Sequence, residues 1–344
     1  MTNGLAIEAI GLTKKFGDVS AVNDLSFTVN RGEMFAFVGP DGAGKTTTIR
    51  MLCGILAPDA GSGTLLGFDI KTQSEEVKKH IGYLSQKFSL YTDLSIDENI
   101  EFFARIHNVE NFAKKREELL EFTRLKEFRT RLADKLSGGM KQKLALACTL
   151  IHKPEIIFLD EPTTGVDPVT RRDFWKLLAE LMKDGTTIFL TTPYLDEAER
   201  CTRVALLNKG KILASDTPAA VRAMLGQKIL EVICSSVREA FRVAGSDAEM
   251  RAFFTDIQLF GERIDFIFTK GTAAEAEALI TKKFSEHGFT SGEVRAKASS
   301  LENVFIQLMQ SDDAQAAEAA AKAEVETEGA AKTETKSKTK ERAK

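Results

Sequence analysis

The sequence predicts an α/β domain with a largely parallel sheet, followed by a small α+β domain and a tail. Short apolar runs alternate with helical patterns from about Leu5 to Leu225, and this alternation is typical of strand–helix–strand units. The alternation restarts after Gly226. The last residues have almost no bulky apolar side chain, so they cannot bury enough surface to offset the entropy of ordering. We therefore expect three segments, 1–225, 226–311 and a disordered 312–344.

The elements of the first segment follow from its apolar patterns. The runs EMFAFVG and EIIFLDEP are apolar almost throughout, as are strands buried on both faces of a parallel sheet. The helix after the first run spaces apolar residues along one face, namely Ile49, Leu52, Cys53 and Leu56. Residues from about 96 to 132 are helical in pattern and interrupt the strand rhythm. We therefore expect an inserted helical subdomain over about 87–150.

The segment after Gly226 is expected to be a sandwich of split βαβ type. The runs KILEVICSS, DIQLFG and RIDFIFTKG predict strands, because they are short, apolar and β-branched. A helix carrying Leu279, Ile280 and Phe284 follows, and another covers SLENVFIQLM. This order predicts a small α+β accessory domain.

Composition excludes several classes of protein. The net charge is −3, so no global basic field recruits nucleic acid. The four cysteines lack CxxC spacing, which argues against a zinc site or disulfide framework and fits a reducing compartment. The first residues lack the pattern of a signal peptide, and no apolar run approaches the roughly 20 residues of a membrane span. Any membrane function then requires another chain.

A phosphate-binding loop is predicted at Gly39–Thr47. The run GPDGAGKTT fits the pattern GxxxxGK[ST] and lies between a strand and a helix, as the P-loop mechanism requires. Its glycines let backbone N–H groups turn toward phosphate oxygens, and the helix start adds its positive dipole end. Lys45 is expected to reach the β- and γ-phosphates of ATP, and the Thr46 hydroxyl to bind Mg²⁺. The loop residues in this prediction are Gly39, Pro40, Asp41, Gly42, Ala43, Gly44, Lys45, Thr46 and Thr47.

An acidic strand end supplies the other half of such a site. In IIFLDEP, Asp160 is expected to hold Mg²⁺, directly or through water. Glu161 is expected to polarise the attacking water as a general base.

The run LSGGMKQ, Leu136–Gln142, separates this chain from other P-loop proteins. It precedes a helix and is followed closely by the acidic strand end. With the P-loop and LDEP, it resembles the nucleotide-binding subunit of ATP-binding cassette (ABC) proteins over about Leu5 to Leu225. The resemblance implies a P-loop NTPase fold of ABC type and an ATPase activity.

The resemblance assigns further roles. Phe16 is placed to stack on adenine, and Gln86 to contact Mg²⁺ or the attacking water. Ser137, Gly138 and Gly139 close over ATP that a second subunit's P-loop holds, so that two sites form only in a dimer. The loop with Asp167 passes between subunits. Departures from the family are Asp41, Thr46 and Val166, which stand for the usual asparagine, serine and leucine.

Three tasks compete for such an ATPase: a transporter motor, a DNA-repair or chromosome protein, and a ribosomal or regulatory protein. No sustained heptads support the second, and a single cassette disfavours the third. The stretches around Gln86 and Tyr194, with the small domain, resemble ATPase subunits of ABC-2-type multidrug exporters. This resemblance implies a motor on the cytoplasmic face of the inner membrane, bound to an ABC-2 permease. A periplasmic adaptor is a further candidate partner, and no nucleic acid is expected to bind.

Two regions carry finer expectations. Phe88, Leu90, Tyr91 and Leu94 are placed either for a socket that receives the permease or for ordinary subdomain packing. The accessory domain is either regulatory or dimer-stabilising. The transported substrate stays unassigned, because its pocket belongs to another chain.

Pro193 occupies the position of the family's switch histidine, in FLTTPYLDEAERC. A prolyl ring has neither a side-chain donor nor a backbone N–H. Loss of one donor to a developing charge typically costs about 3–4 kcal/mol, or about 10²–10³ in rate, so hydrolysis should be slow while ATP binding persists. A homodimer would be slow at both sites; a heterodimer, which we favour, would be slow at one. A compensating group or water is the remaining alternative.

Overall fold

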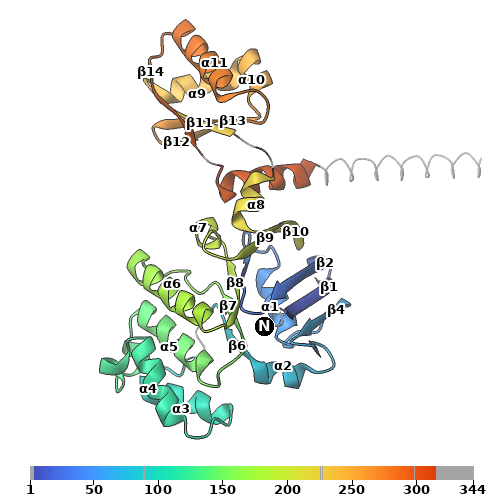
Figure 1. Cartoon of the computed structure of the whole chain (residues 1–344), viewed down its shortest axis with the longest axis vertical. Coiled ribbons are helices and arrows are strands. Elements are labelled where there is room, and N and C mark those ends of the chain that lie inside the picture. Colours follow the sequence, from blue (N-terminus) through green and yellow to red (C-terminus); the bar gives the residue numbers. More distant parts are fainter. Residues whose placement is uncertain (1–3, 88–89, 225, 227, 298, 315–344) are drawn as a thin grey trace, which may run out of the picture. The chain divides into compact units, whose positions relative to one another are not determined.

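The computed structural model describes residues 4–87, 90–224, 226, 228–297 and 299–314. The chain divides into two compact units, Met1–Pro218 and Ala219–Lys344, whereas the sequence analysis placed the boundary at 225/226. Figure 1 shows the elements in chain order. In these described ranges no helix is long and apolar enough to cross a bilayer. The expected tail lies outside the described residues from position 315 onward.

The first unit is built on a six-stranded sheet of order β10-β9-β3-β8-β7-β6. Neighbouring strands pair in parallel, except β9 with β10. The central strands β3, β7 and β8 are buried along their whole length, as continuous apolar runs predict. The bounds are β3 Met34–Val38, β6 Ile81–Leu84, β7 Ile156–Asp160, β8 Thr187–Thr192, β9 Arg203–Asn208 and β10 Lys211–Asp216.

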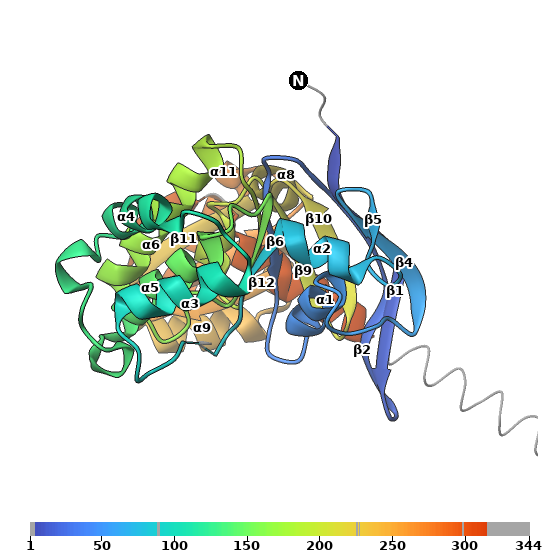
Figure 2. The same ribbon diagram turned by 90° about the horizontal axis from the view of Figure 1, so that it is seen from below.

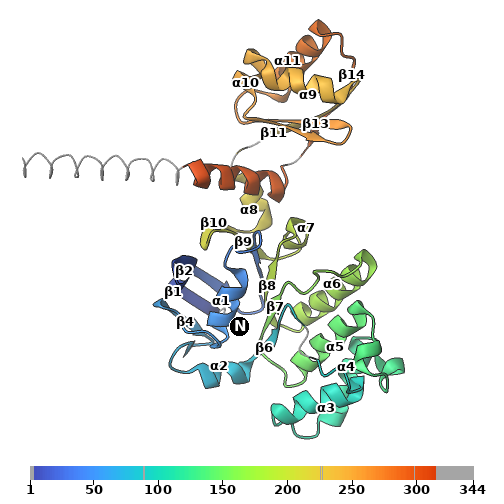
Figure 3. The same ribbon diagram turned by 180° about the vertical axis from the view of Figure 1, so that it is seen from behind.

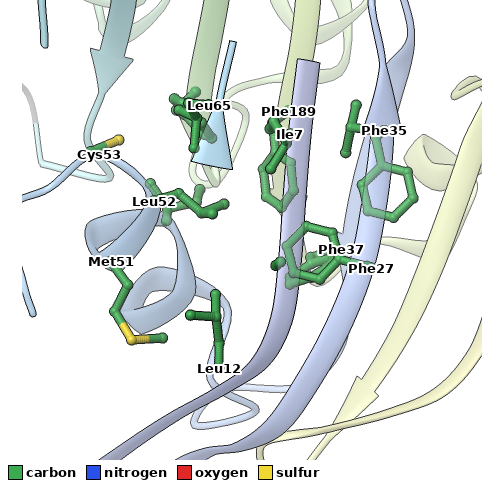
Figure 4. Packing of buried hydrophobic residues seen from close by; sticks show 14 of the residues in the cluster. Ile7, Leu12, Phe27, Phe35, Phe37, Met51, Leu52, Cys53, Leu65 and Phe189 are labelled. Carbon is green, nitrogen blue, oxygen red and sulfur yellow. The ribbon is translucent and has the colours of Figure 1, made fainter. Parts of the chain in front are cut away.

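A second, antiparallel sheet of order β2-β1-β4-β5 completes the main core. Its strands are β1 Leu5–Phe16, β2 Val19–Asn30, β4 Ala60–Leu65 and β5 Phe68–Asp69. Aromatic rings join the two sheets: the Phe37 ring lies 4.8 Å from Phe27 and 4.9 Å from Phe189, edge to face. Figure 4 shows this cluster beside Met51 and Leu52 of α1 (Lys45–Leu52). The core therefore lies between the sheets and holds the first helix in place.

The helices of the first unit separate into two groups. Figures 1 and 2 show α3 to α6 on one side of the large sheet, and α1, α2 and the small sheet on the other. The helix α3 starts at a capping box between Ser95 and Glu98, which satisfies two backbone donors at once. The remaining bounds are α2 Ser74–His80, α3 Ile96–Ile106, α4 Phe112–Phe122, η1 Lys126–Phe128, η2 Ala133–Lys135, α5 Gly138–Leu150, α6 Pro168–Lys183 and α7 Leu195–Ala198. The boundary between the two units falls in α8, Pro218–Ala223.

The second unit is a separate α+β sandwich with its own core. Its antiparallel sheet has the order β12-β13-β11-β14, and Figure 3 shows α9, α10 and α11 on one face of it. The bounds are β11 Lys228–Cys234, α9 Val237–Ser246, α10 Ala248–Phe253, β12 Asp256–Phe260, β13 Arg263–Phe268, α11 Ala273–Glu286 and β14 Ser291–Lys297. Residues 301–314 form a further helix. The mixed α/β fold expected from the sequence is confirmed, with the split βαβ order in this unit.

Candidate functional site

The loop between β3 and α1 has backbone geometry that only glycine permits at two positions. A Cβ on Gly39 would lie 2.3 Å from the carbonyl oxygen of Leu207, and one on Gly44 would lie 2.4 Å from that of Ala21. Gly44 also has φ 98°, in the left-handed region that disfavours other residues. These glycines let the loop pass close to β9 and β2 and lead directly into the start of α1.

Lys45 is the cation of this loop. It is 4% exposed, and its Nζ donates to the carbonyl oxygens of Gly39 at 2.8 Å and Pro40 at 3.0 Å. The same Nζ lies 3.2 Å from Glu161 Oε1. A buried ammonium needs such compensation, and a phosphate could replace the carboxylate. The loop therefore holds a positive charge that can pair with a bound anion.

Oxygen atoms gather beside the lysine at the carboxyl ends of β7 and β8. Thr46 Oγ1 donates to Asp160 Oδ1 at 3.0 Å, and Thr191 Oγ1 donates to the same oxygen at 2.7 Å. Tyr83 OH lies 3.4 Å from Asp160 Oδ2; burial, and secondly the Asp160 charge, raise the pKa of Tyr83 to about 12, so the phenol stays a donor. Hydroxyl and carboxylate oxygens are the ligands that Mg²⁺ prefers, and the residues present fit that ion.

Glu161 adopts a constrained conformation next to this cluster. Its φ of 49° lies in the left-handed region, which non-glycine residues hold only where the surroundings fix them. Its backbone N–H donates to the Thr191 carbonyl oxygen at 3.1 Å. Gln86 Nε2 donates to Glu161 Oε2 at 2.9 Å. The structure thus brings together the predicted residues Lys45, Thr46, Gln86, Asp160 and Glu161.

The predicted residues Ser137, Gly138 and Gly139 form the start of α5. Ser137 Oγ accepts a hydrogen bond from Met140 N at 3.3 Å and caps this helix. A Cβ on Gly139 would lie 2.2 Å from Thr170 Cγ2 of α6, whereas one on Gly138 would meet open space. In the described part of the chain, the side-chain hydrogen bonding of Ser137 stays within its own helix and does not reach Gly39–Thr47.

The remaining predicted nucleotide-binding residues differ in their exposure to solvent. Phe16 ends β1 with 53% of its surface exposed, and Lys14 Nζ lies 5.8 Å from its ring centroid. Pro40, Asp41 and Gly42 are exposed, Thr47 is half-buried and Ala43 is buried. An exposed aromatic ring is what stacking on a base requires.

Pro193 follows the last residue of β8 and is half-buried. Its neighbours are firmly held: Thr192 Oγ1 donates to Glu197 Oε2 at 2.8 Å, and the Arg171 guanidinium lies 4.4 Å from the Tyr194 ring centroid. The backbone at position 193 is thus held by contacts of the residues on both sides.

An apolar pocket of about 330 Å³ lies between the sheet and the helical subdomain. His107 and His152 stack in its wall with ring centroids 3.8 Å apart. Of the four residues expected to form a socket, Leu90 lines this pocket, Tyr91 is 45% exposed, Leu94 is half-buried, and Phe88 lies outside the described residues. The pocket's other lining includes Cys53, Ile55, Lys78, Ile81, Tyr83, Leu84, Phe103 and Cys148.

Sequence reasoning missed Tyr83, Thr191 and Glu197. Tyr83 and Thr191 lie near the carboxyl ends of β6 and β8, which flank β7 in the sheet. Ligands bind at that edge in open α/β sheets, so the strand order would have revealed both. Glu197 gives no local signal.

Comparisons with known proteins agree with this geometry. The family model described as "ABC transporter" matches residues 22–164. The chain is 46% identical over 219 residues to "Probable multidrug ABC transporter ATP-binding protein YbhF" of Escherichia coli, across 63% of this chain but only 38% of that protein. It is 36% identical to "Nod factor export ATP-binding protein I" of a Rhizobium species, across 88% of this chain and 97% of the relative.

A solved structure of an ATP-binding cassette shares the fold of the first unit. It is a dimer in a post-hydrolysis state bound to ADP and Pi, and it is 26% identical with a TM-score of 0.56. The match covers 61% of this chain and 98% of the cassette.

Proposed function

The chain belongs to the family of ABC transporter ATP-binding proteins, and on that premise we propose that it binds and hydrolyses ATP to power export through a separate permease. One observation carries the proposal: Lys45, Thr46, Gln86, Asp160 and Glu161 converge on one side of the phosphate loop. The first unit is then the nucleotide-binding domain and the second an accessory domain.

The residues divide the work of hydrolysis. Lys45 and the backbone N–H groups of Gly39–Thr47 hold the phosphates, and Phe16 stacks on the adenine. Thr46 and Asp160, with Gln86, hold Mg²⁺, which supplies electrostatic stabilisation of the phosphate oxygens. Glu161 accepts a proton from the attacking water. Its contact with Gln86 links the base to the segment that leads to the apolar pocket.

A second nucleotide-binding subunit completes the site. A Cβ on Gly138 would meet open space, and the Ser137 side chain bonds only within its own helix in the described residues. The N-terminus of α5 can therefore approach a phosphate that is bound by a second subunit. The loop before α6 is fixed by Asp167, whose Oδ1 accepts from Val169 N and Thr170 N at 3.1 and 3.0 Å. We place this loop at the interface between subunits.

The apolar pocket is the docking site for the permease. Three large apolar side chains at or beside it are solvent-exposed, Tyr91 at 45%, Ile55 at 57% and Ile106 at 55%, and clustered exposed apolar residues mark interaction sites. An ABC-2-type permease at this surface would hold the chain on the inner face of the plasma membrane, with a periplasmic adaptor as a further partner of the permease. The transported molecule is not assigned.

The docking proposal is tested with Ile55→Lys. This change should abolish co-purification with the permease while single-turnover hydrolysis by the chain alone stays unchanged. Ile10→Lys is the matched control, because Ile10 is equally exposed at 57% but lies on β1, away from the pocket. Equal loss of binding in both variants would contradict the assignment.

The slow site at Pro193 is the finer part of the proposal. Thr192 and Tyr194 hold the segment in place, so a histidine at 193 would present its imidazole without rebuilding the loop. Pro193→His should raise the hydrolysis rate by about 10²–10³, measured in single turnover with the chain in excess over ATP. Pro193→Ala restores only the backbone N–H and should change the rate little. An equal gain from alanine, or none from histidine, would exclude the missing donor as the cause.

A further inference from the structure

Glu197 is a fully buried carboxylate outside the residues assigned above. It lies on the one-turn helix α7 and is 0% exposed. Its Oε1 accepts a hydrogen bond from Thr163 Oγ1 at 2.6 Å, and its Oε2 accepts one from Thr192 Oγ1 at 2.8 Å. A buried carboxylate is costly unless donors satisfy it, and here each oxygen has a separate hydroxyl donor from a different segment.

The two threonines lie beside the chemistry. Thr163 comes two residues after Glu161, in the loop that runs on to Asp167. Thr192 ends β8 immediately before Pro193, and its Oγ1 also accepts from Tyr194 N at 3.0 Å. One carboxylate therefore joins the segment after the general base to the segment at the switch position.

Arg171 of α6 adds a third connection. Its Nε lies 3.4 Å from Glu197 Oε1, and its guanidinium covers the Tyr194 ring at 4.4 Å. Asp167 caps the start of the same helix. The interface loop, α6 and the switch segment are thus connected through one buried charge.

The neighbouring threonine faces the other way. Thr191 Oγ1 donates to Asp160, and the Thr191 carbonyl oxygen accepts from Glu161 N. Since successive strand residues point to opposite faces, Thr191 holds the acidic strand end while Thr192 holds Glu197. The chain on both sides of Glu161 is therefore held in place. Asp160, before it, bonds to Thr191, and Thr163, after it, bonds to Glu197.

We propose that Glu197 is a positioning residue, which sets the orientation of Glu161 and links it to the interface loop through Thr163 and to the switch segment through Thr192. The inference rests on the proposed ATP hydrolysis. Glu197 is fully buried and acts through the two segments that it holds. Its effect therefore appears in the rate of the chemical step, and the affinity for ATP depends on the phosphate loop instead.

The test compares Thr163→Val, Thr192→Val and the double variant of the full chain in single-turnover hydrolysis. Each valine keeps the side-chain shape and removes one hydroxyl. We expect each single change to lower the rate about tenfold, the effect of one lost hydrogen bond of about 1.4 kcal/mol. The double variant should lose much less than a hundredfold, because the groups act as one unit. The Kd for ATP should stay within about twofold of the wild-type value.

Conservative variants separate positioning from general stability. Thr163→Ser and Thr192→Ser keep the hydroxyl and should keep the rate, and Asp196→Asn, an exposed carboxylate on the same helix, should have no effect. Unchanged rates in the valine variants would overturn the inference and leave the proposed ATPase activity standing. The same holds if the valine variants lose Tm and ATP affinity together with rate, because that pattern reflects general destabilisation. A wild-type chain that never converts bound ATP overturns the proposed function and this inference together.

Discussion

Replacement of Glu161 by glutamine tests the ion pair between this residue and Lys45 of the phosphate loop. The Lys45 ammonium lies 3.2 Å from the Glu161 carboxylate, and both residues are more than nine-tenths buried. Glutamine has nearly the same shape but no charge. The variant therefore leaves Lys45 without its anionic partner until a phosphate arrives.

The loss of stability in Glu161→Gln depends on the hydrogen bonds that Lys45 retains. Removal of one partner of a buried ion pair costs about 3–5 kcal/mol, but the carbonyl oxygens of Gly39 and Pro40 still accept from Lys45 Nζ. We expect a loss of about 2–3 kcal/mol without nucleotide, or about 4–12 °C in Tm for a unit of this length. ATP supplies the missing anion. A recovered 2 kcal/mol corresponds to about 30-fold tighter ATP binding than in the wild type, while hydrolysis falls by about 10²–10⁴.

Thermal denaturation of the full chain over a series of ATP concentrations measures both quantities. Glu180→Gln is the control, since Glu180 is an exposed carboxylate on α6. Equal Tm values without nucleotide and equal ATP affinities in Glu161→Gln and the wild type would refute the ion pair. Loss of hydrolysis alone would support Glu161 as the base but not the pairing with Lys45.

Three further changes have expected outcomes. Burial, and secondly the His107 charge, lower the pKa of His152 to about 4, whereas the histidine of the unfolded chain binds a proton near pH 6.5. The free energy of unfolding should therefore fall by at most about 3 kcal/mol as the pH drops from 6.5 to 4. His152→Gln should flatten that part of a Tm–pH profile. Gly138→Ala should leave Tm unchanged but slow hydrolysis by the dimer, whereas Gly139→Ala should lower Tm through its clash with α6. Asn99→Ala removes the four hydrogen bonds that this buried side chain makes to residues 91–95 and should cost roughly 3–5 kcal/mol, measured by urea denaturation.

The parts that the sequence predicted are local in the chain. Gly39, Gly44 and Lys45 lie within one loop, and Asp160 and Glu161 end one apolar strand, so pattern and spacing were enough to find them. The helices α9 and α10 were missed because the cap at Asp247 divides them into segments too short for a clear helical period. Glu197 was missed for a different reason: its partners Thr163 and Thr192 come from other segments, and only the folded chain brings the three together.

The end of β8 also bears on how this protein could change over generations. The strand finishes at Thr192, so the sheet needs no N–H from position 193, and the extended backbone of Thr192 suits a following proline. The fold thus accepts either proline or histidine there. Two of the four proline codons differ from a histidine codon by a single base. If position 193 sets the hydrolysis rate as proposed, a lineage could therefore pass between a slow and a fast ATPase in one mutation, without an unstable intermediate.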